Sequence, residues 1–217
     1  MRSLLALPLL LAALPAFAQR TDDQLWLQAS GTVPVTAHSE ATIENIVRFG
    51  DRAKGLAHTE IGGLYAWKIG KIEIGIGYRH VEDFSDGRAL PNEERTRQHI
   101  IVPLAAGLAA RIRVEQRFNS SGSGIGHRVR GQLRFTHALT RGGFGLFAAH
   151  ETFLNLNTTG WGQREGVERM RNSIGLGVPV SRQLRLETGY LNQYRFGRNG
   201  ARDQMDHAVT LSLTLRA

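Results

Sequence analysis

The sequence predicts an all-β fold, an antiparallel transmembrane β-barrel of roughly 10 to 12 strands, with about 12 favoured because such barrels have even strand numbers. Three observations carry this prediction. Apolar and polar residues alternate over repeated segments of about ten residues, as they do in strands with two different faces. The connections between these segments are alternately short and long. After residue 18 we find no stretch with helical periodicity.

The N-terminal segment "MRSLLALPLLLAALPAFAQR" is interpreted as a cleaved signal peptide over residues 1–18. Arg2 supplies a positive n-region, residues 4–14 an apolar h-region, and Ala16-Phe17-Ala18 a small-residue cleavage site. The apolar run is too short for a membrane helix and contains Pro8. We therefore expect an exported protein whose barrel domain comprises residues 19–217.

The segment "KIEIGIGYRH" at 71–80 shows the alternation in its simplest form. Isoleucines and Tyr78 occupy every second position, and Glu73, Gly75, Gly77 and Arg79 occupy the others. Because successive side chains of a strand point to opposite faces, the isoleucines predict a lipid-facing stripe. The glycines are expected on the inner face, where they leave room for long arginines from other strands.

Ten further segments extend the pattern along the chain. They lie at 24–33, 41–49, 58–67, 97–105, 110–118, 128–136, 144–153, 169–178, 184–194 and 208–215, with 97–105 and 144–153 less regular. Short connections are expected near 68–70, 106–108, 139–142 and 179–183, and longer polar ones near 83–96, 119–126, 155–165 and 197–204. Short turns at one end and long loops at the other are typical of outer-membrane barrels.

The eleven candidate strands conflict with the even number expected of bacterial barrels. With an odd number, the first and last strands would run in the same direction. The sequence leaves two explanations open: one strand is missing from the count, or an N-terminal strand is not a full member of the wall.

Aromatic residues give an independent indication of the barrel. Phe49, Tyr78, Phe118 and Tyr194 share the apolar face of their segments near the long connections, and Trp67 lies beside a tight turn. Such girdles mark the boundary between lipid and water. The alternative is a soluble secreted β-sandwich, which also has short alternating strands. Long unbroken apolar faces opposite repeated arginines favour the barrel.

Six short motifs resemble, in order and spacing, the DUF2490 family. They are "DDQLWLQ", "RFG", "RVEQRF", "RVRGQLRF", "ETFLNLN" and "GYLNQY". The resemblance extends from Asp22 to Leu215. It implies a Gram-negative outer-membrane β-barrel without an established activity, so no catalytic residue is carried over from it.

Charged residues on the polar faces define the candidate functional surface. A charge on the lipid face costs about 2–4 kcal/mol at the midplane, so the barrel interior is the expected location of these groups. The lumen-lining candidates are Arg48, Glu60, Glu73, Arg79, Arg111, Arg113, Glu115, Arg117, Arg128, Arg130, Arg134, Glu151, Arg169, Arg171, Arg185 and Glu187. Arginines outnumber glutamates, which predicts either a narrow anion-favouring channel or a sealed, salt-bridged structural barrel.

A lipid-modifying outer-membrane enzyme is the alternative from another functional class. His80, His150 and His207 lie near strand ends, but we find no nucleophile with a suitably spaced base. His150 and Glu151 are adjacent and are expected to point to opposite faces. We also find no metal-binding motif, and the sequence contains no cysteine. We therefore expect no catalytic site, no metal and no cofactor.

The sequence thus predicts an exported outer-membrane protein. Its net charge of +8 in a secreted chain makes nucleic acid an unexpected partner. Membrane lipid and lipopolysaccharide are the expected surroundings, small anionic solutes are candidate ligands, and a monomer is the expected state.

Overall fold

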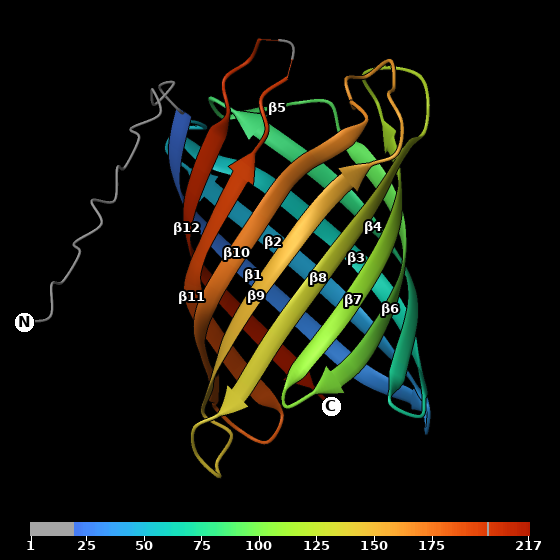
Figure 1. Ribbon diagram of the computed structural model, residues 1–217, viewed down its shortest axis with the longest axis vertical. Helices are drawn as coiled ribbons and strands as arrows, with labels where there is room; N and C mark the ends of the chain where they lie inside the picture. The colour runs from blue at the N-terminus through green and yellow to red at the C-terminus, as the bar shows by residue number, and fades with distance from the viewer. Residues whose placement is uncertain (1–19, 199) are drawn as a thin grey trace, which may run out of the picture.

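The computed structural model describes residues 20–198 and 200–217, which form one closed β-barrel (Figure 1). The predicted signal peptide lies outside the described residues. The strands are β1 (Arg20–Thr36), β2 (Ser39–Gly50), β3 (Gly55–Ile69), β4 (Ile72–Ser85), β5 (Arg88–Ala89), β6 (Glu93–Ala105), β7 (Leu108–Asn119), β8 (Gly126–Ala138), β9 (Gly145–Asn155), β10 (Gly166–Pro179), β11 (Leu184–Arg195) and β12 (Gln204–Arg216). In the part of the chain that the structure covers, no helix has the length and apolarity needed to cross a membrane.

Eleven of these strands form the barrel wall, and each is one of the eleven segments that alternate in the sequence. The two-residue strand β5 extends only the end of β4. The predicted all-β barrel of 10 to 12 strands is therefore confirmed. Consecutive wall strands pair antiparallel, as expected.

The wall closes between β1 and β12, and this pairing is parallel. Its register runs from Arg20 opposite Gln204 to Thr32 opposite Arg216. The closure resolves the conflict over strand number: within residues 20–198 and 200–217 the wall has no further strand, and β1 is a full member of it. The barrel is consequently mixed and not wholly antiparallel, because an odd number of alternating strands brings the first and last into the same direction.

The two rims of the barrel differ in their connections (Figure 1). We call the rim with residues 37–38, 70–71, 106–107, 139–144 and 180–183 the short-turn rim, and the rim with 51–54, 86–92, 120–125, 156–165 and 196–203 the long-loop rim. Ala106 and Gly107 both have positive φ, 47° and 84°, which matches the right-handed twist of a two-residue hairpin. The predicted loop at 83–96 is shorter than expected, because β6 already begins at Glu93.

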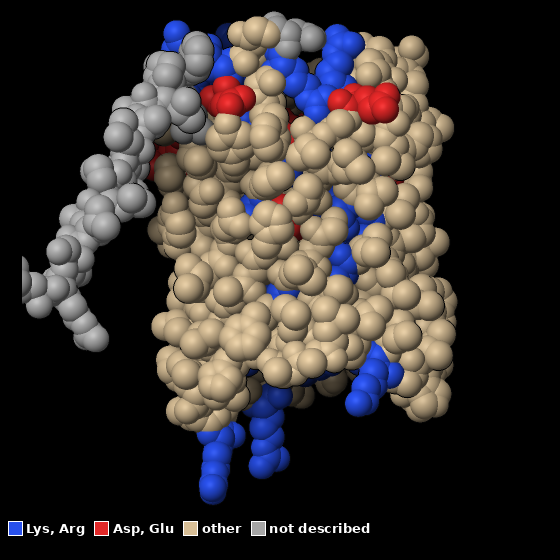
Figure 2. All heavy atoms as spheres, in the orientation of Figure 1, with Lys and Arg blue, Asp and Glu red and all other residues tan. Residues whose placement is uncertain are grey.

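The outer surface is apolar over the part next to the short-turn rim. In β12, Val209, Leu211, Leu213 and Leu215 are all exposed outward. Figure 2 shows charged side chains gathered at both rims, with a wall of mostly uncharged residues between them. Of the aromatic residues predicted to form a girdle, Phe49, Trp67, Tyr78 and Phe118 are exposed, while Tyr194 is only partly exposed.

Nearer the long-loop rim, the outer surface becomes polar. The hydroxyl of Thr96 donates to Gln116 at 2.5 Å, and Asn172 accepts a 2.8 Å contact from the His150 ring. The wall strands have 11 to 17 residues, and all but β9 are longer than the ~9–11 residues of a typical transmembrane strand. The polar pairs therefore mark the part of each strand that extends past the apolar belt.

The barrel has little apolar core. Its buried apolar cluster consists of Trp26, Leu191 and Ala208. Arg97, Gln193 and Asp206 are among the most buried side chains, so the interior is held mainly by polar and ionic contacts.

Candidate functional site in the barrel interior

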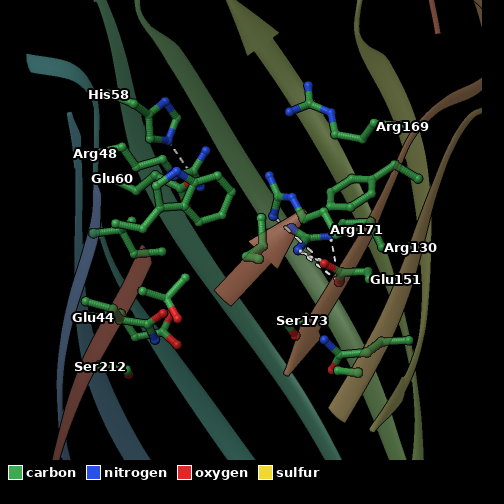
Figure 3. A pocket seen from close by; sticks show the side chains of 18 of the residues that line it. Glu44, Arg48, His58, Glu60, Arg130, Glu151, Arg169, Arg171, Ser173 and Ser212 are labelled. Atoms are coloured by element: carbon green, nitrogen blue, oxygen red, sulfur yellow. Dashed lines mark hydrogen bonds and ion pairs between the residues drawn. The ribbon is translucent and has the colours of Figure 1, made fainter. Parts of the chain in front are cut away.

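A cavity of about 500 Å³ lies inside the barrel (Figure 3). Strand alternation points one side chain in two toward it, and the sequence supplies mostly charged residues at those positions. Its charged lining consists of twelve arginines, Arg48, Arg79, Arg95, Arg111, Arg113, Arg117, Arg128, Arg130, Arg134, Arg169, Arg171 and Arg195, and five carboxylates, Glu44, Glu60, Asp83, Glu151 and Glu187. The wall of the cavity is therefore strongly basic.

Glu60 on β3 is the centre of a first group of ion pairs. Its carboxylate lies 3.1 Å from Arg48 Nη2, and it also accepts a hydrogen bond from Arg79 Nη1. Arg95 approaches to 3.7 Å, and the His58 ring lies at 2.8 Å. One buried carboxylate thus faces three guanidinium groups from three different strands.

Glu44 on β2 connects strands that are not neighbours. Its Oε2 lies 2.7 Å from Arg79 Nη2 on β4 and also accepts from Arg97 Nη2 on β6. Since β3 and β4 separate β2 from β6 in the wall, the Arg97–Glu44 pair reaches across part of the interior. Such pairs connect distant parts of the wall and restrict its deformation.

Glu115 and Glu151 form a second group on the β7–β8–β9 side. Arg130 bridges them, with Nη1 2.8 Å from Glu115 and Nη2 2.9 Å from Glu151. Arg128 Nε donates to Glu115 at 2.8 Å, and Arg111 Nη2 donates to Glu151 at 2.9 Å. Figure 3 shows Arg130, Arg171 and Glu151 together on one side of the cavity and Arg48, Glu60 and His58 on the other.

Two aromatic side chains lie between the arginines. The guanidinium carbons of Arg130 and Arg171 are 4.3 and 4.6 Å from the centre of the Phe153 ring. Trp26 has Arg48 at 4.0 Å and Arg171 at 4.8 Å. Cation–π contacts of this kind strengthen when they are desolvated, and Phe153 is only 1% exposed. The aromatic faces compensate part of the charge that the carboxylates do not neutralise.

Arg113 on β7 differs from its neighbours. It is 6% exposed, and its Nε is sealed without a hydrogen-bond partner among the described residues. Among the described residues, the carboxylate within 4 Å of the Arg113 guanidinium is that of Glu115, at 3.9 Å. This carboxylate already accepts hydrogen bonds from Arg128 and Arg130. The residues directly opposite Arg113 on the adjacent strands are Arg130 and His99. Arg113 is thus the least compensated cation of the cavity wall.

Small side chains make room for the long ones, as the sequence predicts at Gly75 and Gly77. A Cβ placed on Gly77 would lie 2.9 Å from Arg97 Nε. A Cβ on Gly75 would lie 2.6 Å from the His99 ring, so one of the two neighbours is a histidine and not an arginine.

A second cavity of about 650 Å³ opens at the long-loop rim. Trp161, Arg164, Arg198 and Arg202 contribute to its lining. It shares three lining residues with the central cavity: Asp83, Arg117 and Arg195. We call the outer cavity the vestibule and these three residues the neck.

One carboxylate beside the vestibule has a perturbed pKa. In the loop between β11 and β12, Asp203 accepts hydrogen bonds from the Tyr194 hydroxyl and from the Gly197 amide, the latter at 2.7 Å. The Tyr194 hydrogen bond, followed by that from Gly197, holds the pKa of Asp203 below its ordinary value of 3.8.

The structure places the predicted lining residues at different positions of the interior. Thirteen of the sixteen line the central cavity directly, and Glu115 lies just behind it in the ion-pair network. Glu73 lies apart from the main groups and pairs with His99 at 3.1 Å. Arg185 lies toward the short-turn rim, 3.4 Å from Glu187.

Four interior residues of β6 are absent from the prediction: Glu93, Arg95, Arg97 and His99. Arg95 and Arg97 contact Glu60 and Glu44, while Glu93 pairs with Arg95 and with Arg117 at 2.7 Å. The signal was present in "EERTRQHI", where charged residues recur at every second position from Glu93. The aromatic partners Trp26 and Phe153 were also missed as parts of the site.

The three histidines considered for catalysis lie on the outer surface. His80 contacts Glu94 at 2.7 Å, His150 contacts Asn172, and His207 contacts the Tyr190 hydroxyl at 2.6 Å. None of the three lines either cavity. Across residues 20–198 and 200–217, no cluster of three histidine or carboxylate side chains is arranged to hold a metal ion.

A family model described as a protein of unknown function, DUF2490, matches residues 23–205. The chain belongs to the DUF2490 family. An uncharacterised protein of Methylorubrum extorquens is 32% identical over 205 residues, which cover 90% of this chain and 88% of the relative. No solved structure matches this DUF2490 chain.

Proposed function

We propose that this DUF2490 protein is an outer-membrane barrel that provides a narrow, anion-favouring pathway through its interior. The observation that carries the proposal is the lining of the central cavity, where twelve arginines face five carboxylates. Rings of arginine and lysine favour anions in membrane pores. Arginine also remains charged at every physiological pH, so this preference does not depend on protonation.

The outer surface supports a membrane location. The apolar stripe of β12 and the matching stripes of the other strands suit lipid, while the polar pairs of Thr96 and His150 lie beyond this belt. Long loops face the outside in bacterial barrels. The vestibule would then open to the exterior, and the short-turn rim, with Lys68, Lys71 and Arg182, would face the periplasm.

The pathway would run from the vestibule through the neck into the central cavity. Arg117 and Arg195 in the neck and three vestibule arginines would attract anions, with Asp83 in the neck and Glu93 and Glu168 in the vestibule as the opposing charges. A focused positive potential in a low-dielectric channel raises the local concentration of anions. The narrow interior predicts small conductance.

Planar-bilayer recording under a potassium chloride gradient tests the proposal. We expect small conductance steps whose reversal potential has the sign of chloride selectivity. Arg195→Gln should lower that selectivity, while Arg141→Gln, which alters an exposed turn residue, should not. Cation-selective conductance, or selectivity equal in both variants, would contradict the proposal.

A sealed structural barrel is the second candidate, and the ion pairs that reach across the interior favour it. Arg97 with Glu44 and Arg134 with Glu187 at 2.8 Å both join strands that are not neighbours. An electrically silent barrel with normal heat-modifiable migration in the outer-membrane fraction would support this candidate. A freely soluble periplasmic protein would exclude both.

A further inference from the structure

We infer that the central cavity is a binding site for a small multivalent oxyanion, a phosphate or a phosphate-bearing solute, with Arg113 as its principal charge. The inference rests on the proposed function in one respect, since it places the ligand in the same anion-favouring interior. It goes further by assigning a bound ligand class and a residue that holds it.

The first argument is the charge state of Arg113. A guanidinium does not release its proton in proteins, so this 6% exposed side chain is cationic. Glu115 lies 3.9 Å away and is engaged by Arg128 and Arg130. A buried charge without close compensation is costly. An anion in the cavity would supply the missing counter-charge.

The second argument is the surroundings of Arg113. Arg111 lies two residues away on the same inner face of β7 and has a sealed Nε without a hydrogen-bond partner among the described residues. Arg130 lies directly opposite Arg113 on β8 and also lines the cavity. Several guanidinium groups facing one space suit an oxyanion with several acceptor oxygens better than a monovalent halide.

The third argument is the chemistry of another part of the cavity wall. Ser173 on β10 and Ser212 and Thr214 on β12 line the same cavity with short hydroxyl side chains, whereas the Thr210 hydroxyl donates to the Gly189 carbonyl at 3.2 Å. Figure 3 shows Ser173 and Ser212 at the cavity, below the ion pairs in that view. Hydroxyls donate to phosphate oxygens without adding charge. A volume of about 500 Å³ is within the usual range for small-molecule sites.

Equilibrium dialysis with radiolabelled inorganic phosphate tests the inference. The full-length mature barrel, folded in detergent, is dialysed at constant ionic strength set with sodium chloride. We expect saturable binding by the unmodified protein and binding weakened by about tenfold or more in Arg113→Gln, since a hydrogen bond to a charged group is lost. Arg141→Gln is the matched control and should bind as the unmodified protein does. Equal affinity in Arg113→Gln, or complete displacement of phosphate by equimolar chloride, would overturn the inference.

Thermal unfolding of the same samples separates a ligand site from a structural arginine. If Arg113 is a surplus charge, Arg113→Gln should unfold at the same or a higher temperature without phosphate. Phosphate should raise the unfolding temperature of the unmodified barrel but not that of Arg113→Gln. A lower unfolding temperature of Arg113→Gln in phosphate-free buffer would assign Arg113 a structural role and overturn the inference.

Neither measurement uses a membrane current. A barrel that binds phosphate but is electrically silent would keep the ligand site and remove the pathway. A barrel that conducts anions but shows no saturable phosphate binding would do the reverse.

Discussion

Neutralising Glu151 should strongly destabilise the barrel. Its carboxylate is 5% exposed and accepts from Arg130 at 2.9 and 3.0 Å and from Arg111 at 2.9 Å, with Arg171 at 3.9 Å. Glu151→Gln keeps the shape of the side chain and one acceptor oxygen, so it creates no cavity. The loss is that of one buried negative charge shared by three arginines of the cavity wall. Breaking a buried ion pair from one side costs about 3–5 kcal/mol.

The assay is urea unfolding of the barrel folded in lipid vesicles, followed by tryptophan fluorescence and by heat-modifiable gel migration. Glu40→Gln is the control, because Glu40 pairs with Lys68 at 2.7 Å and Arg216 at 3.1 Å at the short-turn rim, where both cations are exposed. That change should cost at most about 1 kcal/mol. Equal losses in the two variants would refute the view that the interior ion pairs hold the barrel together.

Three further substitutions test other parts of the structure. Ile174→Arg, on the apolar outer belt, should lower the free energy of unfolding from vesicles by about 2–4 kcal/mol. The control Asn172→Arg, on the same strand and face, should lower it by only about 0–1 kcal/mol. Similar costs at both positions would place the belt elsewhere. Phe153→Ala should lower the free energy of unfolding by about 3–5 kcal/mol in the same assay, because the ring is 1% exposed and lies between arginines. A loss of stability below about 1 kcal/mol would argue against those contacts. Tyr194→Phe should raise the pKa of Asp203 toward 3.8, because the hydroxyl that favours the carboxylate is removed. Since the pKa of Asp203 is lowered in the folded loop, the Tyr194–Asp203 contact stabilises the loop at a pH above the ordinary pKa, and this stabilisation is lost as the pH falls through the lowered pKa. Carboxyl-carbon NMR titration of the unmodified protein and of Tyr194→Phe measures the change.

The strand pattern and the inward and outward faces were accessible from sequence because both depend on local alternation. Ile72 and Ile76 are exposed outward and Arg79 is buried inward, as the alternation of their segment predicts. Every candidate strand became a wall strand. The parallel closure was not accessible, since alternation within a segment does not encode which strand it pairs with, and the even-number rule pointed away from the eleven strands that the pattern contained.

β6 shows why part of the site was missed. Its outward residues Glu94, Thr96 and Gln98 are polar because this part of the strand extends past the apolar belt. With polar residues on both faces, the apolar–polar contrast disappears, although the inward charges still recur at every second position. The weak compensation of Arg113 could not be predicted for a different reason: pairing across the interior depends on distances between strands far apart in the sequence.

The parallel seam between β1 and β12 also determines how the barrel can form and be rearranged. At the seam Ser30 donates to Thr214 at 3.3 Å, and these residues are 184 positions apart. Contacts of such high sequence separation are slow to form, and β1 and β12 are the two open sheet edges until the seam closes. The seam further constrains circular permutation. In an even-stranded barrel a short turn can join the first strand to the last, but here the start of β1 and the end of β12 lie on opposite rims. A permuted chain would need a linker as long as the barrel is tall, so this wall has a fixed first strand and a fixed last one.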